Sequence, residues 1–351
     1  MKRNFQIFLF SLILIFGPLS GCLEETAETI EPDGGIIQQD YPSWEKVATI
    51  SSMRDSAIFF ADFTAEGKMI ATFTNSGAYS VIEFWNTTDQ TRITEISPES
   101  RINGGALSPT ENSMVTYGSG VMQVWDLENF TLERTIQIEE DIENCMKFSD
   151  DGAFLITAHD DWIISVWNTT DYSRVSSFDY GGQIYDADIS SENDFLAVGG
   201  YKRDVKVWNL ETSELEATLN QPEAWVVGVD FSPNGGYLAS SSSSLGLGGD
   251  SEIFVWEMSD WSVHSSIVDQ ENRVFGLEFS PDSKFLSTTW DSGVAYFYDV
   301  GTNYLVQTIP IGPFGFGDGV NNGDILHNVF ENQILVIDEG GINIQILVRI
   351  D

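Results

Sequence analysis

Histidine and cysteine are scarce in this chain of 351 residues, which has three of the first and two of the second. None of them stands in a CxxC or HExxH spacing, and no GxSxG nucleophile turn or phosphate-binding loop occurs. His159, His264 and His327 are far apart, and the repeats described below assign them to different structural units. The sequence therefore predicts a non-catalytic protein without a cofactor.

Basic residues are few as well. Lysine and arginine number 16 against 54 aspartates and glutamates, which gives a formal net charge of −38. Such a charge repels nucleic acid and anionic lipid headgroups, so no nucleic-acid partner is expected. Because the hydrophobic fraction of 42% is ordinary for a globular protein, the acids are expected on the surface of a folded core. There they would favour solubility or collect cations.

Long hydrophobic runs are absent beyond the N-terminus. Lys2 and Arg3 precede an apolar run from Phe5 to Phe16 that is short for a membrane-spanning helix and typical of a secretory signal. The next motif, Leu19-Ser20-Gly21-Cys22, resembles the lipobox of prokaryotic lipoproteins. This resemblance implies cleavage before Cys22, lipid on its thiol, and an extracytoplasmic protein anchored to the cell membrane. An ordinary signal peptide is the alternative.

A spacer is predicted after this signal. Residues 23–43 contain six acids, no base and a Pro-Asp-Gly-Gly break. The expected organisation is a signal peptide over 1–21, an acidic flexible linker over 22–43 that starts at lipidated Cys22, and one folded domain over 44–351.

One repeated segment dominates this domain. Its clearest copy is FSPDSKFLSTTWDSGVAYFYDV from Phe279 to Val300, and related copies begin at Phe148 and Phe231. Alternating apolar and polar residues predict strands, while Pro-Asp and Asp-Ser-Gly predict turns. An aromatic residue near the end of the third strand recurs at spacings of 40 to 48 residues, at Trp85, Trp125, Trp167, Trp208, Trp256 and Tyr298. Units of this length stack on one another.

These repeats resemble the WD40 family of β-propellers. The resemblance implies an all-β propeller with four antiparallel strands per blade. The repeats, with the two ends of the domain joined as described below, predict seven blades. Two departures stand out: the Gly-His dipeptide of the family is missing, and Ile346 stands where the last aromatic is expected. The family's buried His–Asp–Ser/Thr–Trp network is therefore expected to survive only in part, as Asp161 with Trp167 and Asp291 with Tyr298.

The two ends of the domain are predicted to share the seventh blade. Trp44 to Ile50 has the pattern of an outer strand without a preceding blade, and residues 324–350 supply three strands without a fourth. Joined, they close the ring and leave no open sheet edge, as expected for a monomer. Trp44, Val47 and Ile50 are the apolar positions expected to fix the added strand.

The turns fall on two rims. Three N-x-[ST] sequons at Asn86, Asn129 and Asn168 follow third strands and are candidate glycosylation sites on one rim. Turns between second and third strands, together with the crossovers between blades, form the other rim, which includes loops 240–252 and 310–323. Aromatic and basic residues typical of binding hot spots are expected there: Trp162, Tyr201, Lys202, Arg203, Trp225, Arg273 and Phe316.

The predicted function is a membrane-anchored scaffold that binds unidentified partner proteins. One alternative is a propeller enzyme, a lactonase-like hydrolase or quinoprotein-like dehydrogenase, which requires polar side chains converging in the central channel. The other is a calcium- or glycan-binding surface receptor, for which Asp318 and Asp324 are weak calcium candidates. Cys145 is expected as a buried free thiol on an innermost strand.

Overall fold

The computed structural model describes residues 29–30, 36–37, 43–51, 58–65, 67–77, 79–243, 251–269, 272–311, 325–328, 333–337 and 343–350. The chain divides into two units, residues 1–41 and 42–351. In the first unit, β1 (Thr29–Ile30) pairs with β2 (Ile36–Ile37) in antiparallel fashion. Within the described ranges no helix has the length and apolar character needed to cross a membrane.

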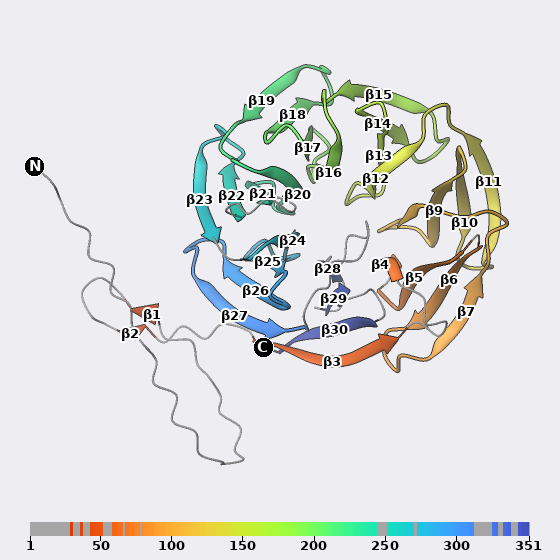
Figure 1. Ribbon diagram of the computed structural model, residues 1–351, viewed down its shortest axis with the longest axis horizontal. Helices are drawn as coiled ribbons and strands as arrows, with labels where there is room; N and C mark the ends of the chain where they lie inside the picture. Colours follow the sequence, from red (N-terminus) through yellow and green to blue (C-terminus); the bar gives the residue numbers. More distant parts are fainter. Residues whose placement is uncertain are drawn as a thin grey trace, which may run out of the picture. The chain divides into compact units, whose positions relative to one another are not determined.

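The second unit is a ring of seven four-stranded antiparallel sheets, which confirms the predicted seven-bladed propeller (Figure 1). Blades 1 to 3 consist of β4 (Ile58–Phe63), β5 (Met69–Ser76), β6 (Tyr79–Asn86) and β7 (Arg92–Ile96); β8 (Gly104–Leu107), β9 (Ser113–Gly118), β10 (Val121–Asp126) and β11 (Thr131–Gln137); and β12 (Ile142–Phe148), β13 (Phe154–His159), β14 (Ile163–Asn168) and β15 (Arg174–Asp179). Blades 4 to 6 consist of β16 (Ile184–Ile189), β17 (Phe195–Gly200), β18 (Val205–Asn209) and β19 (Leu215–Leu219); β20 (Trp225–Phe231), β21 (Tyr237–Ser243), β22 (Ser251–Glu257) and β23 (Val263–Asp269); and β24 (Val274–Phe279), β25 (Phe285–Trp290), β26 (Val294–Asp299) and β27 (Leu305–Pro310). Blade 7 consists of β28 (Ile325–Asn328), β29 (Gln333–Ile337), β30 (Asn343–Ile350) and β3 (Ser43–Ser51).

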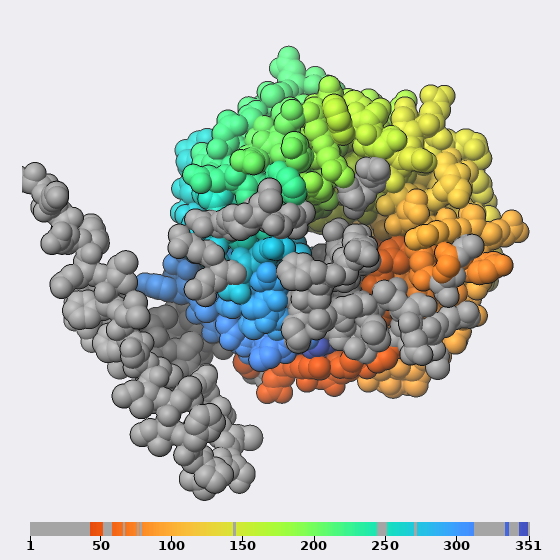
Figure 2. Space-filling view, in the orientation of Figure 1, coloured from red at the N-terminus to blue at the C-terminus, as the bar shows by residue number. Residues whose placement is uncertain are grey.

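The hydrophobic core lies between blades. Each of the seven buried clusters combines residues of two neighbouring sheets, as Ile156 of blade 3 and Leu196 of blade 4 illustrate. No blade buries both of its faces by itself, so each blade depends on its neighbours for stability. The innermost strands surround its centre, where the space-filling view is hollowed (Figure 2).

The seventh blade is closed by the N-terminal strand, as predicted. β3 pairs with β30 from Ser43↔Ile350 to Ser51↔Asn343, and the two strands lie side by side at the outer edge of the ring (Figure 1). Trp44 is 3% exposed and stacks on Phe297 of blade 6 at 5.2 Å. The side chain of Gln307 accepts a hydrogen bond from Trp44 N–H at 2.7 Å and donates one to Trp44 C=O at 2.9 Å. The seam is therefore fixed to blade 6 as well.

The prediction that Val47 helps to fix this strand is wrong. Val47 is 55% exposed because the register of β3 shifts between Lys46 and Ala48, which leaves Val47 as the extra residue of a β-bulge. Ala48 instead packs on the core cluster between blades 7 and 1, together with Ile50.

A bulge recurs between the third and outer strands of every blade, next to the recurring aromatic. In blade 7 the extra residue is Val47 of β3, since Lys46 pairs with Leu347 and Ala48 pairs with Ile346. Leu347 pairs with Ile334, the second residue of its strand, as Trp85 pairs with Ile70. Leu347 therefore occupies the tryptophan position, and the assignment of that position to Ile346 is wrong.

Of the hydrogen-bond network that the resemblance implied, the structure contains a tryptophan–threonine bond. The indole N–H of Trp167 donates to Thr157 Oγ1 at 2.8 Å, and that hydroxyl also contacts His159 Nε2 at 3.0 Å. Trp85 and Trp125 bond threonines in the same way. Asp161 does not take part in these hydrogen bonds. Its carboxylate accepts the N–H of Ile163 and shapes the turn. Asp291 likewise accepts the N–H of Arg273, so its expected pairing with Tyr298 is replaced by a link to the crossover.

The expected loop over residues 240–252 is shorter than predicted. Ser240 to Ser243 belong to β21 and are fully buried, and Ser251 and Glu252 begin β22. Small hydroxyl side chains fit the crowded space between blades, where Ser242 donates to Glu252. Residues 244–250 and 312–324, with Phe316, Asp318 and Asp324, lie outside the described residues, as does Cys22.

Candidate interaction rim

The turns between second and third strands share one geometry in blades 3, 4 and 6. A backbone N–H returns to the last residue of the second strand, from Trp162 to His159 O at 3.1 Å, Arg203 to Gly200 O at 3.4 Å and Gly293 to Trp290 O at 2.9 Å. The donors have φ of 71°, 63° and 75°. Glycine adopts this left-handed conformation freely, whereas any other residue loses about 1 kcal/mol or more. Trp162 and Arg203 therefore stand at positions where folding favours glycine.

Trp162 remains largely exposed in this conformation. Its side chain is 51% exposed and makes no ring contact with another residue of the described ring. Aromatic residues in the same conformation on the opposite rim behave differently. Phe130, Tyr172 and Trp261, with φ of 54° to 58°, are partly buried and pack on core clusters between blades. Their conformation serves folding, but that of Trp162 presents an indole to solvent.

A row of aromatic rings lies on blades 4 and 5. Tyr201, 52% exposed, faces Trp225 with ring centroids 5.3 Å apart, and Trp225 faces Tyr185 at 6.2 Å. The N–H of Tyr201 donates to Gln183 O at 2.9 Å and ties the turn to the neighbouring crossover. Burial, followed by the nearby Tyr201, raises the pKa of Tyr185 above its ordinary value. The row runs from an exposed ring to a half-buried one.

Two exposed bases adjoin this row. The Lys202 side chain lies over Gly182, where an added Cβ would come within 3.0 Å of its Cγ, so the missing side chain makes room for the lysine. Neither Lys202 nor Arg203 forms an ion pair with a residue that the structure describes. We call Trp162, Tyr185, Tyr201, Lys202, Arg203 and Trp225 the rim patch.

The structure thus brings Tyr201, Lys202, Arg203 and Trp225 together and places Trp162 on the adjacent blade. Arg273 is half-buried at the crossover into blade 6 and is not part of this group. Tyr79 was missed: it is 73% exposed and begins β6, directly after the turn between the second and third strands of blade 1. Tyr185 was missed because it lies within a strand and reaches Trp225 only through tertiary packing.

The central channel contains a charge network on three innermost strands. Lys147 of β12 lies 2.9 Å from the Asp188 carboxylate of β16 and 3.3 Å from that of Asp230 of β20. Each carboxylate also accepts a backbone N–H of the next blade, from Phe231 at 2.8 Å and from Phe279 at 2.7 Å. Burial lowers the pKa of Lys147, but the Asp188 and Asp230 carboxylates outweigh it and hold the pKa well above its ordinary value. The network joins blades 3 to 6.

The enzyme alternative requires a reactive group, for which Cys145, His159 and Asp150 are the titratable candidates near the channel. Burial, followed by Asp186, raises the pKa of the Cys145 thiol, which keeps it protonated. Burial lowers the pKa of His159, and its ring is bonded to Thr157. Asp150 is exposed, yet desolvation by the surrounding channel and then the Asp188 carboxylate raise its pKa to about 6. Among the described ranges no group of three His, Cys, Asp or Glu is arranged to hold a metal ion.

The three sequons lie on the opposite rim, at third-strand ends, where two of the asparagines stabilise turns. Asn86 Oδ1 accepts the N–H of Thr88 at 2.8 Å, and Asn168 Oδ1 accepts that of Thr170 at 2.9 Å. Asp126 accepts the N–H of Glu128 in the same way, and Asn129 donates its side-chain N–H to Asp126 at 2.6 Å. Turn formation therefore explains these asparagines without modification, and glycosylation stays a prediction.

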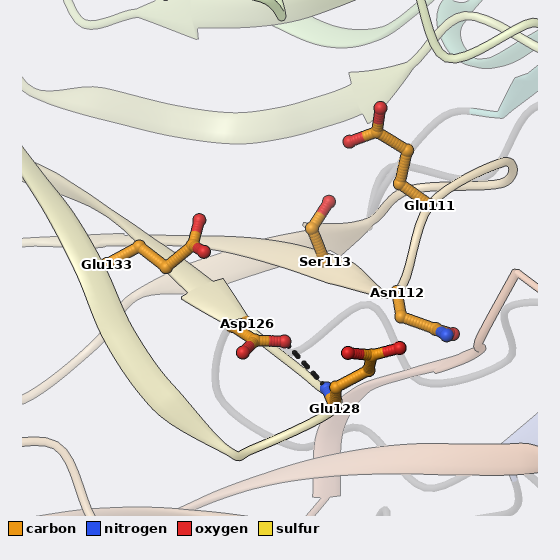
Figure 3. A pocket seen from close by; sticks show the side chains of 6 residues that line it. All are labelled: Glu111, Asn112, Ser113, Asp126, Glu128 and Glu133. Atoms are coloured by element: carbon orange, nitrogen blue, oxygen red, sulfur yellow. Dashed lines mark hydrogen bonds between the residues drawn. The ribbon is translucent and has the colours of Figure 1, made fainter.

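The same side of blade 2 carries an acidic hollow of about 340 Å³ (Figure 3). Glu111, Asp126 and Glu133 line it from different elements, and the N–H of Glu128 is held by Asp126 at 2.7 Å. Asn112, Ser113 and Glu128 complete the lining. Surface carboxylates of this kind are expected throughout a chain with 54 acids, so the hollow does not by itself indicate a site.

Comparison with known proteins agrees with this architecture. The family model "WD domain, G-beta repeat" matches residues 133–168, 173–209 and 213–257. Each match runs from an outer strand through the first three strands of the next blade, the same offset that leaves β3 to complete blade 7.

Curated relatives match over shorter stretches. "Transcription factor unc-37" of Caenorhabditis elegans is 21% identical over 56% of this chain and 32% of its own length. "Eukaryotic translation initiation factor 3 subunit I" is 32% identical in Aspergillus terreus, over 26% of this chain and 28% of the relative, and 31% identical in Aspergillus oryzae, over 27% and 28%. The chain thus spans about a third of the length of these relatives or less. It carries WD40 repeats, folded into a seven-bladed β-propeller.

Proposed function

We propose that this chain is a non-catalytic scaffold that binds partner proteins through the rim patch. The observation that carries the proposal is the exposure of Trp162, Tyr201 and Arg203 on neighbouring turns of a rigid ring, two of them in a backbone conformation that folding does not favour. Trp, Tyr and Arg are the residues that dominate binding energy at protein interfaces. A rigid ring holds them in place before the partner arrives, which lowers the entropic cost of binding.

The proposal includes an extracytoplasmic location and a lipid anchor at Cys22. Its support is the sequence: a basic start, an apolar run and the lipobox-like Leu19-Ser20-Gly21-Cys22. The acidic linker over residues 22–43 would hold the ring away from a membrane whose anionic headgroups repel a chain of net charge −38.

The relatives support an assembly role in general terms. One of them is, by its name, a subunit of a translation initiation factor, and WD40 propellers generally bind other proteins. The strong negative charge argues against nucleic-acid binding by this protein.

The test is affinity capture from membranes of the host with the lipidated protein as bait, followed by mass spectrometry. The triple variant Trp162→Ala/Tyr201→Ala/Arg203→Ala should lose a partner that the wild-type protein retains. The matched control is Tyr304→Ala, because Tyr304 is 50% exposed on the opposite rim. Equal capture by the triple variant and the wild type would refute the rim patch as the interface.

A further inference from the structure

We infer that the rim patch recognises an acidic segment of its partner, with a carboxylate at Lys202 and Arg203 and an adjacent apolar side chain on Tyr201 and Trp225. This inference rests on the proposed function and names the chemistry of the partner.

The first argument is the state of the two bases. Acids outnumber bases 54 to 16 in this chain, so a surface base can find an acid nearby. Arg92, Arg174 and Lys284 do so, with carboxylates at 2.5, 3.7 and 3.8 Å. Lys202 and Arg203 are adjacent and exposed, and neither has an ion pair with a described residue. Two neighbouring bases are thus left for a carboxylate from outside.

Two acids of the same rim, Asp161 and Glu140, have partners of their own. Asp161 accepts the N–H of Ile163 at 3.2 Å and shapes its own turn. Glu140, at the crossover into blade 3, contacts Arg174 at 3.7 Å. Neither acid forms an ion pair with Lys202 or Arg203 in the part of the chain that the structure describes.

The second argument is that the Lys202 side chain and the Arg203 backbone are positioned in advance. The Lys202 stem lies over the bare backbone of Gly182, and the turn of Arg203 is closed by its own N–H to Gly200 O. A base held by its surroundings loses less conformational freedom when it binds a carboxylate. An arginine can also form two parallel charge-assisted hydrogen bonds to one carboxylate.

The third argument is the apolar neighbour of these bases. Tyr201 precedes Lys202 in the same turn, and its ring faces Trp225 at 5.3 Å. This pair offers a flat apolar surface beside the two positive charges. The complementary ligand is a short segment with aspartate or glutamate next to leucine or phenylalanine. A long polyanion fits poorly, because the rest of the surface repels it.

The test uses the purified full chain and a synthetic fluorescent peptide in which aspartates alternate with leucines and phenylalanines. A matched peptide with asparagine at each aspartate is the ligand control. We expect saturable binding of the acidic peptide, about tenfold weaker binding of the amide peptide, and weaker binding at high ionic strength. Arg203→Gly should weaken the acidic peptide about tenfold and the amide peptide little. Because glycine suits this backbone position, the variant should stay folded with an unchanged or higher melting temperature.

Lys46→Ala, which removes an exposed base on the outer strand of blade 7, should bind as the wild type does. The inference would be overturned if both peptides bind equally, if neither binds, or if Arg203→Gly binds the acidic peptide as tightly as the wild type does. It would also be overturned if the protein prefers anionic vesicles or single-stranded DNA to the acidic peptide. If the triple variant loses its captured partner while the acidic peptide fails to bind, the proposed function stands and this inference falls. If no partner depends on the patch, the proposed function falls by itself.

Discussion

Trp44→Ala tests whether the ring is held closed by the N-terminal strand. Trp44 is 3% exposed, belongs to the core cluster between blades 6 and 7, and stacks on Phe297. Its removal leaves a cavity at the one place where a blade is completed by a distant part of the chain. Truncation of a buried tryptophan costs about 3–5 kcal/mol. The two hydrogen bonds of Gln307 go to the backbone of Trp44 and are retained, so the loss should not exceed this range.

The assay is equilibrium unfolding in urea, read by circular dichroism, with Val47→Ala as matched control. Val47 lies on the same strand but is 55% exposed on the bulge, so its truncation should change the free energy of unfolding by less than about 0.5 kcal/mol. Deletion of residues 24–39, which precede the strand, should also leave stability unchanged. If Trp44→Ala and Val47→Ala destabilise the protein equally, the seam does not hold the ring closed.

The remaining predictions concern the channel, the anchor and calcium. Lys147→Met leaves two carboxylates without their base and should lower the free energy of unfolding, measured in urea, by about 2 kcal/mol. This is less than the roughly 3–5 kcal/mol of a fully buried pair, because the lysine side chain is 38% exposed. A variant as stable as the wild type would contradict this. Asp150 has a pKa raised to about 6 in the folded state, so it favours folding at low pH and loses that contribution as pH rises from about 4 to 6. The melting temperature of Asp150→Asn relative to that of the wild type should therefore increase over this interval. Parallel curves of melting temperature against pH would count against the channel electrostatics. Cys22→Ser should release the protein from membranes or leave an uncleaved precursor on immunoblots, whereas normal cleavage with unchanged membrane retention argues against the lipobox. If Asp318 binds calcium, millimolar calcium should raise the melting temperature of the wild type but not of Asp318→Ala, and a flat response of both would dismiss this site.

The architecture could be predicted from the sequence because each blade repeats its own signals. The turn residues on either side of Phe285 to Trp290 predicted a strand with the bounds that the structure has. The closing strand could be predicted because an unpaired outer strand and an incomplete blade complement each other. Sequence spacing failed at the bulges. One extra residue in β3 reverses the faces of that strand and exposes Val47. Leu347 and not Ile346 holds the tryptophan position because it pairs with Ile334, which the spacing of aromatic residues could not show in a strand without one.

The rim patch was predictable only where its residues lie in turns or, like Trp225, at the start of a strand after a crossover. Trp162, Tyr201, Lys202 and Arg203 follow second strands, and their rim is given by strand order alone. Tyr185 lies in a strand, and its contact with Trp225 depends on how neighbouring blades pack.

The channel network could not be predicted either. Lys147, Asp188 and Asp230 are about 40 residues apart, and only ring closure brings them together. The sequence does not show which charged residues meet in the fold, so these three look like the many other charged residues of the protein.

Trp162→Gly gives the most direct test of the claim that the rim patch serves binding and not folding. The melting temperature and the capture of membrane partners are measured on the same preparation. We predict a melting temperature that is unchanged or raised by about 2 °C, because strain at φ of 71° is relieved, together with a loss of partner capture. A lower melting temperature with undiminished capture would contradict the account, since it would show that Trp162 supports the fold.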